Sequence, residues 1–166
     1  MLIRPMTSTD LPGVLAVQQR CYGPAFHEPL AAFASKLAGA PDTCWVASTA
    51  TEGILAYLVS LPVDAHSLPA LHATQWQAPA QAQRLYLHDL AVAPIARGRS
   101  LAPRLVARAQ QCARDMGLQQ MVLVAVQGSE SFWQGQGFAA QAMLAGAPGD
   151  KLASFGPDAR FMACTL

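Results

Sequence analysis

The chain has 166 residues, of which 52% are apolar and only 13% are charged, and its formal net charge is +1. This length and composition predict a single domain over residues 1–166 with a sizeable core, and the near-neutral charge argues against a dedicated nucleic-acid binder. Because no apolar run has the length of a signal peptide or a transmembrane helix, and the four cysteines show no metal-ligand spacing, we expect a cytoplasmic protein with reduced thiols, no metal and no membrane partner.

The first half of the chain predicts a strand, two helices and a β-hairpin. After a strand over Leu2–Met6, a capping residue among Ser8, Thr9 and Asp10 should begin a helix that runs to about Tyr22. A second helix and the two hairpin strands are expected over Pro29–Leu37, Cys44–Ser48 and Ile54–Leu61, with a turn at 49–53.

The segment Pro62–Gln83 is long for a loop in a compact domain. It carries Trp76 and the histidines His66 and His72 among three prolines. Two interpretations stay open for it. It is either a lid over the acceptor site or a surface insert with a tethering aromatic residue, and a short helix over 70–76 is an alternative to the lid.

A central strand, a long helix and a buried strand follow. The segment Arg84–Val92 reads as a central strand, and Leu101–Met116 carries an apolar stripe at helical spacing, with Gly117 to end the helix. Met121–Val126 is a continuous apolar run, as expected for a strand covered on both faces. A short helix capped by Ser129 and three closing strands are expected over 129–135, 139–145, 151–155 and 159–165. The order of elements predicts a mixed α/β (α+β) fold.

The junction between the central strand and the long helix reads VAPIARGRSLAPRL, residues 92–105. A helix that begins near Leu101 leaves its first N–H groups unbonded and gathers positive partial charge at that end. Gly98 lets the backbone approach a ligand closely, and Arg97 and Arg99 add full charges. These features suit a diphosphate site. The same residues suit a helix capped by Ser100 with solvated arginines equally well.

Three motifs, in this order, resemble those of the GNAT acetyltransferase family. They are Leu90-Ala91-Val92, Arg97-Gly98-Arg99-Ser100-Leu101-Ala102 and Phe132-Trp133-Gln134-Gly135-Gln136-Gly137-Phe138. The similarity is strongest from Arg84 to Phe138, and both ends of the chain also look like those of the family. Two positions depart from the family pattern, because Ser100 stands in place of a glycine and Trp133 in place of a tyrosine.

The resemblance implies the GNAT fold, a mixed and mostly antiparallel central sheet that splays between two parallel strands and is flanked by helices. It also implies acetyl-CoA as co-substrate, with the pantetheine arm in the splay and the pyrophosphate at the loop. The implied cofactor-binding residues are Leu90, Ala91, Val92, Arg97, Gly98, Arg99, Ser100, Leu101, Ala102, Ser129, Phe132 and Trp133. The implied reaction is direct transfer of an acetyl group to a primary amine of a small molecule or peptide, and members of the family often form homodimers.

His88 is the favoured general base. The ordinary pKa of an imidazole, about 6.5, suits proton acceptance at neutral pH. Strand alternation would place His88 on the same face of the sheet as Leu90, with Asp89 on the other face. A buried core histidine is the competing interpretation. Glu28 is a weaker candidate for the base, since the resemblance places the region between the first two helices at the acceptor site, and a solvated surface charge is the competing interpretation of this residue.

The general acid is less well defined, because an indole N–H at Trp133 cannot supply the proton. Ser129 could relay a proton to the departing sulfur, or Tyr86 could reach it. Alternatively, a thiol of pKa about 8.5 leaves as a thiolate without an acid. We favour the last possibility with Ser129 as a helper, so the predicted catalytic residues are His88 and Ser129.

Two other functions remain open. An acyl-CoA-binding sensor with the same fold but little catalysis is motivated by Ser100 and Trp133, and it would bind the cofactor without turnover. A generic α/β domain with a nucleotide-phosphate site would instead bind ADP in preference to acetyl-CoA.

Overall fold

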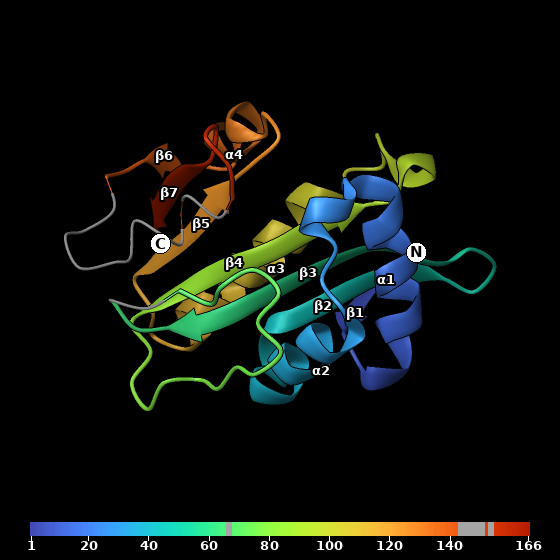
Figure 1. Ribbon diagram of the computed structural model, residues 1–166, viewed down its shortest axis with the longest axis horizontal. Helices are drawn as coiled ribbons and strands as arrows, with labels where there is room; N and C mark the ends of the chain where they lie inside the picture. The colour runs from blue at the N-terminus through green and yellow to red at the C-terminus, as the bar shows by residue number, and fades with distance from the viewer. Residues whose placement is uncertain (66–67, 143–151, 153–154) are drawn as a thin grey trace.

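The computed structural model describes residues 1–65, 68–142, 152 and 155–166. Its strands form one seven-stranded sheet in the order β1-β2-β3-β4-β5-β7-β6 (Figure 1). The strands are β1 (Leu2–Pro5), β2 (Cys44–Thr49), β3 (Gly53–Val63), β4 (Arg84–Val92), β5 (Gln120–Ala125), β6 (Ala139–Ala140) and β7 (Arg160–Thr165). The helices are α1 (Leu11–Cys21), α2 (Leu30–Gly39), α3 (Leu101–Asp115) and α4 (Glu130–Gly135). Every neighbouring pair is antiparallel except β4 and β5, which are parallel. The predicted mixed, mostly antiparallel sheet is therefore confirmed.

The helices cover both faces of this sheet (Figure 1). Residues of α1 and α2, among them Val14 and Phe33, pack with Tyr57 of β3 in one apolar cluster. Residues of α3, among them Leu101 and Leu105, pack in a second cluster on the other face. The predicted apolar stripe of α3 is thus buried at Leu101, Leu105 and Ala109, whereas Met116 at its far end is exposed. The buried start of the helix places the strand-to-helix junction at the edge of the core.

The sheet opens between its two parallel strands. Residues Leu85–Leu87 of β4 pair with Met121–Leu123 of β5, and the ladder ends there. The later residues of both strands, from His88 and Val124 onward, have no partner across this pair. The splay expected from the family resemblance is therefore present.

Several predicted boundaries differ from the observed ones. Residues 8–10 form a separate 3-10 turn, because the Asp10 carboxylate binds Arg4 and the Thr7 N–H, and α1 begins at Leu11. The prediction of a helix over 70–76 is wrong, since these residues form turns and irregular backbone. The strand predicted over 139–145 ends at Ala140. Residues 143–145 of that prediction, and residues 151, 153 and 154 of the strand predicted over 151–155, lie outside the described residues.

No helix in the described part of the chain is both long and apolar enough to cross a membrane.

Candidate active site

A cavity of about 290 Å³ lies where β4 and β5 diverge. Nine of the residues predicted to bind or act on the cofactor line it, namely His88, Leu90, Ala91, Val92, Arg97, Ala102, Ser129, Phe132 and Trp133. The remaining four, Gly98, Arg99, Ser100 and Leu101, belong to the loop and helix start beside it but are not among its lining residues. Motifs that lie far apart in the sequence are therefore brought to one cleft, which we call the β4–β5 cleft.

The loop before α3 has left-handed backbone at two residues. Gly98 has φ of 78° and Ser100 has φ of 54°, and nothing lies within 4 Å of a Cβ built at Gly98. The first backbone bond of α3 runs from the Arg104 N–H to the Ser100 carbonyl at 3.4 Å, so the N–H groups of Leu101 and Ala102 precede the ladder. Donors at this helix start are available to a ligand.

The two arginines of the loop have different surroundings. Arg97 lines the β4–β5 cleft. Arg99 instead pairs with Glu52, with 3.1 Å between Nη1 and Oε2, and also donates to the Ile95 carbonyl. The full charge that the loop offers to the cleft therefore comes from Arg97.

Neither predicted serine cap forms. Ser100 makes no side-chain capping bond, because its left-handed backbone differs from the extended conformation that a capping side chain needs. The Ser129 hydroxyl donates to the Val126 carbonyl at 2.7 Å and makes no capping bond to α4. Ser129 lines the cleft, but its hydroxyl hydrogen is already donated to the Val126 carbonyl.

A β-bulge in β4 places His88 and Asp89 on the same side of the sheet. Asp89 pairs with Val59 of β3 and Leu87 pairs with Ser60, which leaves His88 as the extra residue. The side chains of His88 and Asp89 contact groups on the α1–α2 face, whereas Leu90 packs with the α3-side cluster. The prediction that His88 shares a face with Leu90 and opposes Asp89 is therefore wrong, because the bulge breaks the period of two.

Asp89 is a buried carboxyl group in the cleft, and its pKa differs from the ordinary value. It lines the cavity and accepts a hydrogen bond from the Tyr57 hydroxyl at 2.7 Å. Burial raises the pKa of Asp89 to about 6, although the Tyr57 hydrogen bond acts in the opposite direction. The group can therefore change charge near neutral pH.

Glu28 is the centre of a buried cluster of charges. Its side chain is only 1% exposed, and its Oε2 lies 3.0 Å from Nε2 of His88 and 3.0 Å from Nζ of Lys36. Its Oε1 accepts the His72 N–H at 2.8 Å. Burial acts to raise the pKa of Glu28, but His88 and Lys36 outweigh it and lower that pKa to about 2. The competing interpretation of Glu28 as a solvated surface charge is therefore wrong.

A smaller cavity of about 40 Å³ adjoins the same side chains. His88, Asp89 and Tyr22 line both this cavity and the β4–β5 cleft. Its other lining residues include two aromatic rings, an aliphatic side chain of the long loop and a carboxylate, namely Phe26, Phe155, Leu71 and Glu28. His88 therefore stands at the boundary between two spaces.

The end of α1 closes over the exposed backbone of β4. The Tyr22 hydroxyl donates to the Leu90 carbonyl at 2.6 Å, and the Cys21 thiol donates to the Val92 carbonyl at 3.2 Å. Both side chains line the cleft. The position of Cys21 and Tyr22 at the end of the first helix predicts core packing, near where an acceptor could lie. No local pattern marks their hydrogen bonds to β4, because these bonds depend on α1 packing against β4.

Two aromatic candidates occupy different environments. Tyr86 is 1% exposed, sits in the core with its ring centroid 5.6 Å from that of His88, and is not among the cleft-lining residues. Burial also raises the pKa of Tyr86 above its ordinary value. Trp133 lines the cleft and packs edge-on against Phe132 and Phe138. Of the two, Trp133 is the one in position to contact a cleft ligand.

Within residues 1–65, 68–142, 152 and 155–166, no group of three or more His, Cys, Asp or Glu side chains is placed to hold a metal ion.

Known structures share this architecture over the whole chain. The GphF GNAT-like decarboxylase, solved in complex with isobutyryl-CoA, is 16% identical with a TM-score of 0.78, and 99% of each chain is covered. Ard1 from Thermoplasma volcanium is 15% identical with a TM-score of 0.73, covering 99% of this chain and 97% of that one. The ribosomal-protein-S18-alanine N-acetyltransferase from Escherichia coli is 17% identical with a TM-score of 0.69, covering 99% and 92%. At these identities the likeness establishes the fold.

No curated protein matches the chain. The model of the acetyltransferase (GNAT) family matches residues 11–138, which include α1, the bulged strand β4, the arginine loop and α4. The chain belongs to the acetyltransferase (GNAT) family.

Proposed function

We propose that this protein is an acetyl-CoA-dependent N-acetyltransferase that acts on a primary amine of a small molecule or peptide. The observation that carries the proposal is the place of His88, which is bonded to Glu28 and lines both the β4–β5 cleft and the small cavity beside it. A base at this boundary can take a proton from an amine in the small cavity while the acetyl group lies in the cleft.

The residues of the cleft fit a coenzyme A thioester. The halves of β4 and β5 that do not pair with each other line the cleft and leave backbone groups for a pantetheine arm, apart from the Leu90 and Val92 carbonyls, which already accept from Tyr22 and Cys21. Arg97 with the free N–H groups at the start of α3 suits a pyrophosphate. Trp133 and Phe132 add apolar surface along the same cleft. Acetyl-CoA supplies the activated acetyl group when bound.

Groups of the protein itself then accept the proton and stabilise the charge that develops during the reaction. His88 accepts a proton from the ammonium of the acceptor, directly or through a water, and the neutral amine forms the new C–N bond at the thioester carbonyl. A β4 backbone N–H near Leu90 stabilises the developing oxyanion. The C–S bond breaks and the sulfur leaves as a thiolate, which needs no acid because a thiol has a pKa of about 8.5. The nitrogen of the new C–N bond then loses its second proton, which passes to the departed thiolate or to water. Ser129 can only assist, since its hydroxyl already donates to Val126.

The charges of the small cavity favour an amine as acceptor. Glu28 and Asp89 line it together with Phe26 and Phe155, so a compact cationic group beside apolar surface is well matched. Decarboxylation of a carboxyacyl-CoA, suggested by the name of GphF, is less well matched. Its substrate carboxylate would lie beside Asp89 whenever that side chain is ionised.

The first test is calorimetric titration with acetyl-CoA, followed by thiol release with a panel of primary amines. We expect Arg97→Gln to weaken acetyl-CoA binding about tenfold or more, since it removes a charge-assisted contact. Arg99→Gln is the matched control, because Arg99 pairs with Glu52 outside the lining of the cleft. It should leave binding unchanged.

The catalytic part is tested with His88→Gln. We expect a loss of turnover of about 10²–10⁴-fold with acetyl-CoA binding retained. Binding without thiol release on any amine would favour the sensor function instead. Competition by ADP with no binding of acetyl-CoA would favour a nucleotide site and would refute the proposal.

A further inference from the structure

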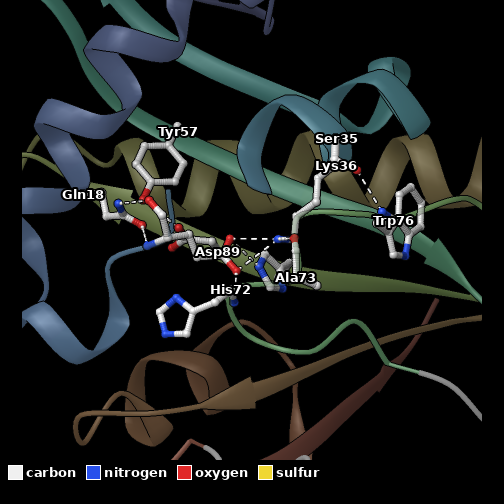
Figure 2. Close-up of polar contacts among 10 residues, drawn as sticks. Gln18, Ser35, Lys36, Tyr57, His72, Ala73, Trp76 and Asp89 are labelled. Atoms are coloured by element: carbon white, nitrogen blue, oxygen red, sulfur yellow. Dashed lines mark hydrogen bonds and ion pairs between the residues drawn. The ribbon is translucent and has the colours of Figure 1, made fainter. Parts of the chain in front are cut away.

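Lys36 is buried away from solvent and binds Glu28, the carboxylate that holds the candidate base His88. The Lys36 side chain is 0% exposed, and its Nζ donates to both oxygens of Glu28 at 3.0 Å and to the Ala73 carbonyl at 3.2 Å. Figure 2 shows Lys36 reaching from α2 to Ala73 of the long loop. Burying an ammonium group costs free energy unless it is paired with an opposite charge. Lys36 and Glu28 therefore each need the other in order to stay charged in the core.

The contacts of Glu28 identify where the hydrogen of the His88 bond lies. Oε1 accepts from Lys36 and from the His72 N–H, and Oε2 accepts from Lys36 and faces Nε2 of His88 at 3.0 Å. An ionised carboxylate has no hydrogen to donate. The hydrogen between Glu28 and His88 is therefore on Nε2 of the imidazole.

This assignment leaves the other ring nitrogen as the proton acceptor. A neutral imidazole carries one hydrogen, so its lone pair is on Nδ1 when Nε2 is the donor. Nδ1 of His88 is buried and has no hydrogen-bond partner among the described residues. His88 also lines both cavities.

We propose that Lys36 is a positioning residue for acetyl transfer: it holds Glu28 ionised, and Glu28 in turn fixes the His88 tautomer whose Nδ1 lone pair accepts the proton. The proposal rests on the proposed function, because it gives Lys36 a part in the same proton transfer.

Lys36 also balances the charge that acts on His88. Asp89 and Tyr86 on β4, Tyr22 at the end of α1 and Glu28 before α2 face His88, and none of these carries a positive charge. Cys21 and the cationic Arg97 also line the β4–β5 cleft. Without Lys36, the Glu28 carboxylate would stabilise the imidazolium alone. His88 would then stay protonated to higher pH, and less of it would be available as a base.

The test is ¹⁵N NMR of histidine-labelled protein, with the His88 signals assigned from His88→Gln. For the wild type we expect the neutral form of His88 to show hydrogen on Nε2 and a lone pair on Nδ1. In Lys36→Met the midpoint of the His88 titration should move to higher pH by at least about 0.5 unit. The acidic limb of the kcat/KM profile should move with it.

Ser35→Ala is the matched control. Its hydroxyl accepts the Trp76 N–H at 2.8 Å, so the variant removes a neighbouring anchor of the same loop but no charge (Figure 2). The His88 midpoint should stay at its wild-type value in this variant. Lys36→Gln, which can still donate to the carboxylate without a charge, is the second variant in case Lys36→Met does not fold, and it should show the same upward shift.

An unchanged His88 midpoint in the folded Lys36 variants, or a wild-type neutral form with hydrogen on Nδ1, would overturn the inference even if the enzyme acetylates amines. Conversely, the expected NMR behaviour in a wild-type protein that acetylates no amine would leave the tautomer and charge balance in place. That result would refute the proposed function and, with it, the catalytic part assigned to Lys36.

Discussion

Replacing Glu28 by glutamine should have a large and pH-dependent effect on stability. The pKa of Glu28 falls from an ordinary 4.5 to about 2 in the folded chain, and each unit of pKa difference between the two states corresponds to about 1.4 kcal/mol. The ionised side chain therefore contributes about 3 kcal/mol at neutral pH. This is a substantial part of a total stability of about 5–15 kcal/mol.

The sign follows from the lowered pKa. Because folding favours the ionised form, the contribution is fully present above pH 4.5 and is lost as the pH falls toward 2. Glu28→Gln should consequently lower the free energy of unfolding by about 3 kcal/mol at pH 7, with a further cost from leaving Lys36 buried and unpaired. The difference from the wild type should shrink steadily between pH 4.5 and pH 2.5.

Urea denaturation followed by tryptophan fluorescence measures both quantities. Glu52→Gln is the control, since it removes a carboxylate from an exposed pair with Arg99 and should leave the midpoint unchanged. The double variant Glu28→Gln/Lys36→Met should be more stable than Glu28→Gln alone, because it removes both buried charges. A loss below about 1 kcal/mol at pH 7, or a difference that does not depend on pH, would refute this reasoning.

Four further variants test the cleft and the loop beside it. The pKa of Asp89 is raised to about 6, so wild-type stability should decrease as the pH rises from about 4 to about 6, and Asp89→Asn should remove this slope in thermal melts. Trp133→Phe should weaken acetyl-CoA binding in calorimetry while leaving the maximal turnover unchanged, and a selective loss of turnover would show that the indole takes part in the chemistry. Gly98→Ala should destabilise the protein by about 1 kcal/mol through backbone strain alone, whereas Ser100→Gly should relieve strain and should bind acetyl-CoA at least as tightly as the wild type.

Local patterns predicted the elements that carry the cofactor motifs. The bounds of β4 match the expected Arg84–Val92, and α3 begins at the expected Leu101, because both segments have a clear apolar period and a recognisable junction. The same patterns could not show the bulge at His88. A bulge depends on how β3 and β4 register with each other, so the alternation rule assigned Asp89 to the wrong face.

The buried cluster of Glu28, Lys36 and His88 could not be predicted from the sequence for a different reason. Glu28 lies before α2 in a segment with no period, and its burial follows from tertiary contacts with Lys36, His72 and His88. One signal was available, since Lys36 falls on the same helical face as Phe33 and Leu37, which are buried. A lysine within an apolar stripe indicates a buried partner of opposite charge.

The short ladder between β4 and β5 has a mechanical consequence. Among the residues that the structure describes, the ladder between Leu85–Leu87 and Met121–Leu123 is the one that joins β5, β7 and β6 to the rest of the sheet. A pantetheine arm in the cleft would replace the missing rungs beyond them. Binding of the coenzyme in the cleft should then slow amide hydrogen exchange in β5 and β7 more than in β2, because the ligand would connect the two parts of the sheet where they do not pair.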